Sequence, residues 1–550
     1  MTTSPTIPSL IITGADVYTG DATRSVAEAV AVSGDRIVAV GTTDEVLALA
    51  GPRTVRRHLP GRMVVAGFQD SHIHPPFGGR NRMNIFLNDT EGRENYLAAI
   101  RAHADSHPDD EWIIGGGWAM EFFPGGTPRK EDLDAIVPDR PVFLFNRDVH
   151  GAWVNSRALE LAGITRDTPD PIDGRIERDP VTGEPSGTLH EGAAYTMNDT
   201  VLPVPSVTDW EGALLNAQSF LHGYGITAWQ DAWVTPDTAT AYRSLAESDR
   251  LTARVVGSLW WERDRGLEQI DGFVQARETM AAGSFHPTTV KIMTDGVLEN
   301  YTGALLQPYC DGCGGHTDNS GIAFLEPDML NAAVTELDRL GFQVHMHAIG
   351  DRAVRNALNA VEAARGANGA SDNRHHIAHI QVVQPTDVPR FHALGVVANC
   401  QPYWAQMEAQ MSELTIPYLG DERSAMQYPF ADLQRSGARL AMGSDWSVTT
   451  ANVLQEIEVA VNRIDPDNRH HATFLPDQRL SLDTALAAFT SGTAYVNHDD
   501  ADSGSIEVGK RADLAVLSRN LFEHDVSEIS DARVELTVAA GRTVFDQAAG

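Results

Sequence analysis

The chain contains two pairs of histidines in which a single residue separates the two rings. His72 and His74 lie in the segment DSHIH, and His345 and His347 lie in the segment VHMH. Both pairs end apolar runs that are typical of β-strands, where residues i and i+2 point to the same face. Imidazole nitrogens are good ligands for divalent transition metals. Each pair therefore predicts a metal site, although two surface histidines in a loop would give the same short pattern.

Two further apolar segments end in chemically active side chains. HHIAHIQVV carries His375, His376 and His379, and ARLAMGSDWS carries Asp445. One histidine in such a place is usually a hydrogen-bonded core or loop residue. Histidines and a carboxylate at the ends of four strands indicate instead that these strands converge on one metal site.

Lysine is rare in this chain, and one lysine lies inside an apolar run. Of the 42 basic residues only Lys130, Lys291 and Lys510 are lysines, and Lys291 lies in the segment TTVKIM. A buried ammonium group is costly, so such a lysine is expected to be neutral, paired or modified. A neutral lysine can react with CO₂ to form a carbamate that bridges two metals, which a guanidinium cannot do. The alternative is a lysine paired with Asp295 or another carboxylate.

The segments that carry these residues are expected to be parallel strands of one sheet. Eight apolar segments follow one another along the chain, at 62–74, 225–232, 253–261, 288–296, 342–350, 375–383, 395–402 and 438–447. Amphipathic helical stretches lie between most of them, for example at 326–341 and 351–366. This alternation predicts a parallel sheet covered by helices. Eight units predict an α/β fold, a (β/α)₈ TIM-like barrel with its active-site groups at the C-terminal strand ends.

The two ends of the chain lack this alternation and resemble each other. Residues 1–66 and 496–550 contain short segments of alternating apolar and polar residues between Gly and Asp turns. We expect one composite β-sandwich domain from both termini, with two unrelated sets of edge strands as the alternative. The barrel would then occupy residues 67–495. About 150 residues separate its first two strands, so residues 76–205 are expected to be an insertion over the barrel mouth.

The composition excludes several classes of partner. A formal net charge of −33 opposes binding to nucleic acid or to an anionic membrane surface. No apolar run reaches the roughly 18 residues that a membrane span requires. Three cysteines cannot form a disulfide framework, and the N-terminus shows no signal peptide, so the sequence predicts a cytoplasmic protein.

Taken in their order along the chain, the motifs at the strand ends resemble those of the metal-dependent amidohydrolase superfamily. Within it, the chain is similar to amidohydrolase family 3, the branch that includes N-substituted formamide deformylases. The similarity runs nearly end to end and rests on GFQDSHIHP, VKIMTDG, HAIGDRAV, HHIAHIQ and GSDWSV, together with GSIEVGKRADLAVL near the C-terminus. One departure is visible: the residue before His379 is Ala378, where this branch usually has an acidic residue. That change could alter the hydrogen bonding around the ligand.

The resemblance implies a binuclear centre, with zinc as the expected metal. One ion would be held by His72, His74 and Asp445, the other by His347 and His379, and carboxylated Lys291 would bridge them. A mononuclear site on the first pair of histidines is the alternative. A hydroxide would attack the substrate carbonyl. Asp445 would carry the proton to the leaving nitrogen, with His379 beside it in the catalytic group.

The same resemblance implies the type of reaction. We expect hydrolysis of a non-peptide C–N bond in a small-molecule amide, most specifically an N-substituted formamide or related linear amide. Cyclic-amide hydrolysis or deamination on the same fold is the alternative, and a barrel that binds a metal or ligand without turnover is a third possibility. A homodimer is expected only by analogy with the family.

Candidate substrate contacts come from three places in the sequence. Similar segments in the family lie near the pocket mouth, and they point to Trp118, Arg147, His150 and Asn155 of the insertion, with a purely structural role there as the alternative. Trp229 and Asp231 end the second strand and are expected to face the mouth, where aromatic rings would suit an apolar amine substituent. His345 is a further candidate. Like His376, it could also support a metal ligand by hydrogen bonding or be an ordinary core residue.

Overall fold

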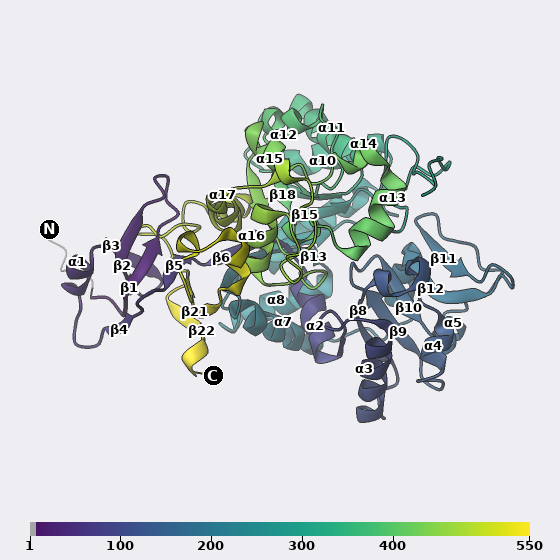
Figure 1. The fold of residues 1–550 in the computed structure, drawn as a ribbon, viewed down its shortest axis with the longest axis horizontal. Helices are drawn as coiled ribbons and strands as arrows, with labels where there is room; N and C mark the ends of the chain where they lie inside the picture. The colour runs from purple at the N-terminus through teal and green to yellow at the C-terminus, as the bar shows by residue number, and fades with distance from the viewer. Residues whose placement is uncertain (1–6, 550) are drawn as a thin grey trace.

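The computed structural model describes residues 7–549, and its centre is a parallel eight-stranded sheet curved into a barrel (Figure 1). Neighbouring strands are parallel throughout, so all the C-terminal strand ends lie at one rim. The predicted (β/α)₈ barrel is confirmed. In chain order the strands are β6 (Phe68–Ile73), β13 (Ile226–Val234), β14 (Arg254–Trp260), β15 (Phe285–Met293), β16 (Gln343–Ala348), β17 (His376–His379), β18 (Val397–Cys400) and β19 (Leu440–Met442).

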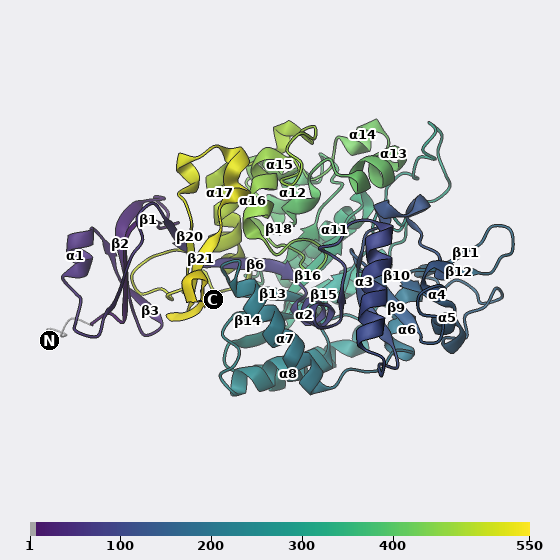
Figure 2. The ribbon, with the colours of Figure 1, turned by 60° about the horizontal axis from the view of Figure 1, so that its bottom comes forward.

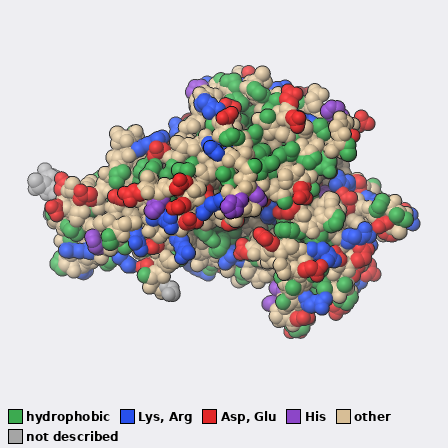
Figure 3. All heavy atoms as spheres, in the orientation of Figure 1, with side chains coloured by type: hydrophobic (Ala, Val, Ile, Leu, Met, Phe, Trp, Pro, Cys, Tyr) green, Lys and Arg blue, Asp and Glu red, His purple; other side chains and the backbone are tan. Residues whose placement is uncertain are grey.

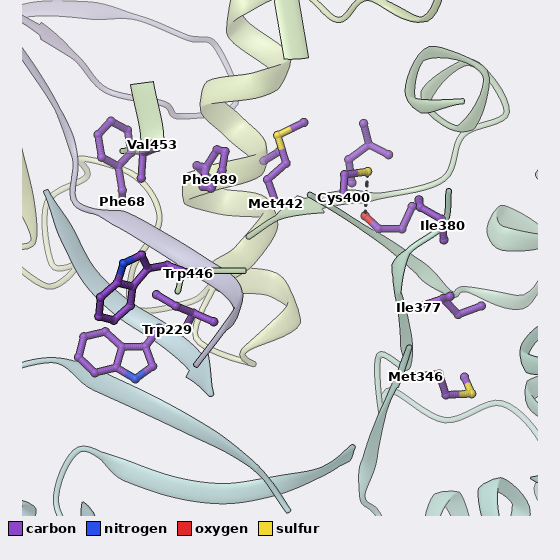
Figure 4. Packing of buried hydrophobic residues seen from close by; sticks show 14 of the residues in the cluster. Phe68, Trp229, Met346, Ile377, Ile380, Cys400, Met442, Trp446, Val453 and Phe489 are labelled. Atoms are coloured by element: carbon purple, nitrogen blue, oxygen red, sulfur yellow. Dashed lines mark hydrogen bonds between the residues drawn. The ribbon is translucent and has the colours of Figure 1, made fainter. Parts of the chain in front are cut away.

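Helices surround the barrel and alternate with its strands. Several begin with strong capping signals, such as Pro236 in the first turn of α8 and the reciprocal Ser206–Asp209 capping box of α7. The helices are α7 (Val207–His222), α8 (Pro236–Glu247), α9 (Ile270–Met280), α10 (Pro327–Arg339), α11 (Asp351–Asn368), α12 (Val388–Leu394), α15 (Phe430–Arg435), α16 (Val453–Asn462), α17 (Leu482–Ala487) and α18 (Thr493–Val496). Their apolar faces and the outer face of the sheet form the largest core of the protein, part of which is shown in Figure 4.

A second eight-stranded sheet is built from both ends of the chain. Its strands are β1 (Leu10–Tyr18), β2 (Val26–Ser33), β3 (Arg36–Gly41), β4 (Val55–His58), β5 (Met63–Ala66), β20 (Leu514–Leu517), β21 (Val534–Ala539) and β22 (Arg542–Asp546). The two ends join where β5 pairs with β20. One face of this sheet encloses its own apolar core, and α1 (Thr43–Leu47) packs on part of the other face. Side chains of β5 and β20 also enter the barrel core, so the composite domain is attached to the barrel by apolar packing.

The segment at 62–74 is divided between the two sheets. The sequence pattern suggested one strand, but β5 belongs to the composite sheet and β6 to the barrel, with Gly67 between them. The first barrel strand is therefore connected to the composite domain with no intervening linker. This connection fixes the base of the strand that carries His72 and His74.

The insertion after β6 forms a third, six-stranded sheet of its own. Its strands are β7 (Ile85–Phe86), β8 (Ile113–Trp118), β9 (Val142–Asn146), β10 (Gly151–Val154), β11 (Gly174–Arg178) and β12 (Pro185–Glu191). The helices α2 (Pro75–Met83), α3 (Arg93–Ser106), α4 (Lys130–Asp134), α5 (Ser156–Leu161) and α6 (Gly192–Thr200) accompany it. Figures 1 and 2 place this sheet and the composite sheet on opposite sides of the barrel.

One face of the protein is mixed in charge despite the acidic composition. Lysine and arginine side chains occur together with acidic side chains across the face shown in Figure 3. In residues 7–549, no helix combines the length and the apolar character that crossing a membrane requires.

Candidate metal centre

Three predicted ligands meet at the rim where the barrel strands end. His72 and His74 come from β6 and its C-terminal end, and Asp445 follows β19. Asp445 Oδ1 lies 3.2 Å from His72 Nε2 and 3.0 Å from His74 Nε2. One potential ligand atom from each of the three residues lies within 4.8 Å of the other two. The structure therefore brings together two imidazoles and a carboxylate from opposite ends of the barrel sequence.

Backbone hydrogen bonds close the barrel at this point. The Asp445 N–H donates to His72 O, and the His74 N–H donates to Trp446 O, each at 2.7 Å. The buried Asp70 carboxylate joins the same seam, because it accepts hydrogen bonds from the N–H groups of His72 and Ser444, both at 3.0 Å. These bonds connect the first barrel strand to the last one. Sequence reasoning missed Asp70, although a carboxylate inside an apolar strand two residues before a histidine pair was the available signal.

The chemistry of the three groups fits a divalent cation. Burial lowers the pKa of His72 to about 3, which leaves its imidazole neutral and able to offer a lone pair. Burial alone would raise the pKa of Asp445, but the two histidines hold it well below its usual range. Among residues 7–549, no donor has hydrogen-bonding geometry to the buried Asp445 Oδ1, even though two ring nitrogens lie close to it. A cation shared by these atoms would satisfy that oxygen.

Lys291 lines the same cavity as this group and is almost fully buried, with 2% of its surface exposed. Within the described part of the chain, no carboxylate forms an ion pair with Lys291. The alternative of pairing with Asp295 is not observed, because that carboxylate accepts hydrogen bonds from the N–H groups of Ala304, Ile349 and Gly350. Burial lowers the pKa of Lys291 to about 7, so a large fraction of its amine is neutral near neutral pH.

His347 and His379 lie together beside this lysine in the cavity wall. Their ring centroids are 4.5 Å apart, and His379 is 4.7 Å from the His72 ring. His347 Nδ1 is hydrogen bonded to Asp295 Oδ1 at 3.1 Å, which fixes the orientation of the ring. The backbones of His379 and Asp445 have φ values of +73° and +58°, a left-handed conformation that is strained for non-glycine residues. Such strain is typical of functional sites.

His345 does not line the cavity, so the prediction that it contacts substrate is wrong. It projects from the same face of β16 as His347 but two residues deeper, level with Lys291. His345 Nε2 shares a hydrogen bond of 2.8 Å with His72 Nδ1, and Nδ1 lies 3.3 Å from Ser258 Oγ. His345 therefore supports a metal ligand from below.

The other two histidines of the segment HHIAHIQVV lie away from the cavity. His376 Nδ1 is 3.1 Å from Asn399 Nδ2 in the barrel interior. His375 precedes the strand at the opposite end of the barrel, where its ring bonds to Asp338 and to the Val344 N–H. Of the three histidines in HHIAHIQVV, the structure thus brings His379 to the candidate centre.

Of the four predicted contacts in the insertion, His150 reaches the cavity. Its Nδ1 lies 3.0 Å from both carboxylate oxygens of Glu191, and its ring centroid is 5.5 Å from that of His347. Burial alone would lower the pKa of His150, but the Glu191 carboxylate raises it to about 9. The insertion therefore supplies a cationic imidazole to the wall of the site.

The remaining three insertion residues lie elsewhere. Trp118 is in the core of the insertion, and its indole N–H donates to Leu144 O at 2.9 Å. Asn155 caps α5, and its side-chain amide donates to Val137 O and Arg140 O. Arg147 borders a neighbouring groove, where it contacts Glu121 at 3.1 Å and Gln410 at 2.8 Å. The contacts of Trp118 and Asn155 are structural, and those of Arg147 lie at the margin of the site.

Trp229 also points away from the mouth, contrary to the expectation. It packs in the core between the sheet and α8, and its indole N–H lies 3.3 Å from the Tyr242 hydroxyl. Asp231 accepts a hydrogen bond from the same hydroxyl at 2.8 Å, and it is absent from the cavity wall. The pairing register of β13 shifts after Asp231, so strict alternation fails there.

Trp233 and Trp260 supply the aromatic wall instead. Their rings stack with centroids 4.6 Å apart, and Phe77 lies 4.6 Å from Trp233. Tyr195 from the insertion meets Trp233 edge to face at 5.8 Å. All four rings line the cavity that contains the candidate ligands. The tryptophans were visible in the sequence, but the irregular end of β13 was not.

Comparison with known proteins gives a family match, similar relatives and a solved structure with a similar fold. Residues 58–545 match the model of the Amidohydrolase family. The chain is 28% identical to the N-substituted formamide deformylase of Arthrobacter pascens over 545 residues, 97% of each protein. It is 30% identical to Protein LONG AFTER FAR-RED 3 of Arabidopsis thaliana, over 98% of this chain and 92% of that protein. The crystal structure of an uncharacterized metal-dependent hydrolase from Pyrococcus horikoshii OT3 has a similar fold, with a TM-score of 0.74 and 23% identity, over 94% of this chain and 99% of that one.

Proposed function

The chain belongs to the amidohydrolase family and is a hydrolase of carbon–nitrogen bonds, and we propose that its substrates are N-substituted formamides or related linear amides. The observation that carries this proposal is the cluster of His72, His74 and Asp445 in the lining of a cavity with an aromatic wall. Its similarity over nearly the full length to an N-substituted formamide deformylase supports the substrate class.

The proposed centre holds two divalent ions, most simply zinc. His72, His74 and Asp445 would bind one ion, and His347 and His379 the other. Lys291 would bridge them after its neutral amine adds to the carbon of CO₂ and loses one proton to form the carbamate. The burial of Lys291 and its lack of an ion pair within residues 7–549 support this role. When bound, such ions lower the pKa of water and polarise a carbonyl oxygen.

The protein groups around the centre would then move one proton and hold the substrate. Asp445, at the cavity wall, would accept a proton from the attacking water and deliver it to the leaving nitrogen. His150, fixed by Glu191, would contact the substrate from the insertion side. The balanced reaction consumes one water and one amide and releases a carboxylic acid and an amine.

The aromatic wall supports an apolar substituent on the nitrogen. Trp233, Trp260, Phe77 and Tyr195 surround the space beside His74. Apolar surface removed from water there would favour a benzyl-like group. The three unpaired cysteines are consistent with the proposed cytoplasmic location.

The proposal is tested by formate release from N-benzylformamide by the protein loaded with zinc. The Asp445→Asn variant removes the proton acceptor while preserving size, so we expect its kcat to fall by at least about 100-fold. Metal analysis of both proteins shows whether the loss reflects chemistry or an empty site. Undiminished turnover by Asp445→Asn would refute the mechanism, and turnover of cyclic amides or aminopurines alone would replace amide hydrolysis by a different reaction on the same fold.

A further inference from the structure

The space around the candidate centre has two lobes that meet at the reacting groups. The aromatic lobe contains Phe77, Tyr195, Trp233 and Trp260. The polar lobe, named for Glu299, Gln381 and Gln410, also contains the apolar Val297 and Ile349 and the rings of Trp404 and Tyr428. Both lobes are also lined by Asp148, His150, His347, His379 and Asp445. A substrate whose scissile bond lies at the metal centre can therefore extend in two directions.

The polar lobe is built from side chains that are held in place. Arg147 Nη2 donates to Gln410 Oε1 at 2.8 Å, and Gln381 Nε2 donates to Gln427 Oε1 at 2.9 Å. The Thr415 hydroxyl donates to Glu299. Because these hydrogen bonds fix the orientations of the polar groups, the lobe is organised before a ligand binds.

The sizes of the lobes bear on the acyl group of the substrate. The aromatic lobe and the polar lobe are similar in size. A formamide has only a hydrogen atom on the acyl carbon. If its nitrogen substituent fills the aromatic lobe, the second lobe is left without an occupant.

The charges of the polar lobe indicate what such an occupant carries. Glu299 is the carboxyl group that only this lobe has, the wall shared with the aromatic lobe adds Asp148, Asp445 and the cationic ring of His150, and no lysine or arginine is among the described residues that line it. Arg147 reaches Gln410 from the neighbouring groove and is already paired with Glu121. Away from the shared wall, the lobe therefore offers a hydrogen-bond acceptor at Glu299.

We propose that the preferred substrates are secondary amides whose acyl group extends beyond formyl and places a hydroxyl or amino group in the polar lobe. This inference rests on the proposed amide hydrolysis and on the assignment of the nitrogen substituent to the aromatic lobe. The reaction is otherwise unchanged: water adds to the acyl carbon, the C–N bond breaks, and the nitrogen leaves with the transferred proton. The products are a hydroxy or amino acid and an apolar amine.

The test compares three amides that share a benzyl group on nitrogen. N-benzyl-2-hydroxyacetamide and N-benzylpropanamide match in size and differ in the hydroxyl, and N-benzylformamide is the reference without an acyl side chain. Benzylamine release by the zinc-loaded full-length protein gives kcat/KM for each. We expect the hydroxyacetyl amide to exceed the propanoyl amide by at least about tenfold. We also expect it to exceed the formamide.

Variants of Glu299 connect this selectivity to the lobe. Glu299→Leu removes the acceptor at similar size, and we expect the ratio of hydroxyacetyl to propanoyl amide to fall to near one. Glu299→Gln keeps an acceptor oxygen and should retain most of the ratio. Metal content and thermal unfolding of each variant identify any that fail to fold.

The possible failures are distinguishable. Hydrolysis of N-benzylformamide with no preference for the hydroxyacetyl over the propanoyl amide would overturn this inference and leave the proposed function intact. A preference that persists in Glu299→Leu would overturn the assignment to the polar lobe. If the zinc-loaded protein hydrolyses none of the three amides, the proposed function itself fails and this inference with it.

Discussion

At the level of single residues, the candidate centre depends on imidazoles that burial keeps neutral. His72 is a clear case, because its Nδ1 bonds to His345 and its Nε2 faces Asp445. Metal-binding histidines are usually oriented by a carboxylate or a carbonyl on the second nitrogen. Here a second buried histidine takes that place, and Ser258 lies behind it.

Replacing His345 by Phe should weaken zinc binding by His72, His74 and Asp445 while the barrel core stays filled. The ring volume is nearly kept, but His72 loses the group that sets its tautomer. Loss of such a partner typically weakens metal affinity by about 10–100-fold. Competition between the protein and a chelator of known zinc affinity measures this change. His375→Asn, at the opposite end of the barrel, should leave the zinc affinity as it is, and equal affinities of His345→Phe and the unmodified protein would refute the role of His345.

Lys291 should determine how many ions are bound. The Lys291→Met variant keeps an unbranched side chain but cannot form a carbamate, so we expect the bound zinc to fall from two ions to about one per chain. Elemental analysis after dialysis gives the number. The matched control is Lys510→Met in the composite domain, which should still bind two. Two ions in Lys291→Met would show that the bridge is unnecessary.

At the level of elements, strand ends and loops that lie far from the centre still hold its strands in register. Asp338 in α10 is an example, because it accepts hydrogen bonds from Ser371, Asn373 and His375 in the segment before β17. Burial alone would raise the pKa of this carboxyl, but these donors hold it well below its usual range. A depressed pKa in the folded state stabilises the protein above the pKa of the unfolded chain, near 4, and this contribution is lost as the pH falls further.

Asp338→Asn should therefore destabilise the protein in a pH-dependent way. At pH 6 we expect the free energy of unfolding to fall by about 1–3 kcal/mol, because an amide cannot replace all the accepted bonds. The difference from the unmodified protein should shrink as the pH is lowered from 5 to 3. Urea unfolding at several pH values measures it. A difference that grows toward low pH would contradict the assigned direction of the pKa shift.

The elements themselves were largely predictable from the sequence, and the details at their ends were not. All eight barrel strands were found because buried parallel strands form nearly continuous apolar runs. His72, His345 and His347 were placed on inward faces by simple alternation. Trp229 was misplaced because alternation does not show which face of β13 turns inward: Trp229 and Asp231 contact Tyr242 of α8, whereas Gln230 between them bonds to Gln343. Asp70 was missed although it lies inside an apolar strand, because the pattern does not show that it accepts hydrogen bonds from the N–H groups of His72 and Ser444.

At the level of the whole molecule, the three sheets are connected in a way that makes the ends of the chain essential. β5 and β20 pair in the composite sheet, and side chains of both also pack in the barrel core. The strand β6, which carries His72, begins two residues after β5 ends. The composite sheet is therefore expected to unfold together with the barrel.

Removing residues 505–550 should prevent stable folding of the rest of the chain. The deletion exposes the edge of β5 and part of the main apolar core, both of which invite aggregation. A chain that ends at Asp546 keeps all the strands and is the matched control. Limited proteolysis and circular dichroism compare the two. A protease-resistant barrel in the longer deletion would show that the composite domain is dispensable.

The central claim is a two-metal centre bridged by Lys291, and a zinc-edge anomalous diffraction map of the zinc-loaded crystal tests it most directly. The account predicts one peak between His72, His74 and Asp445 and a second beside His347 and His379. It also predicts electron density that continues from Lys291 Nζ to both ions. A map with no peak at the first position, or with two peaks and an unmodified Lys291 that touches neither, would contradict it.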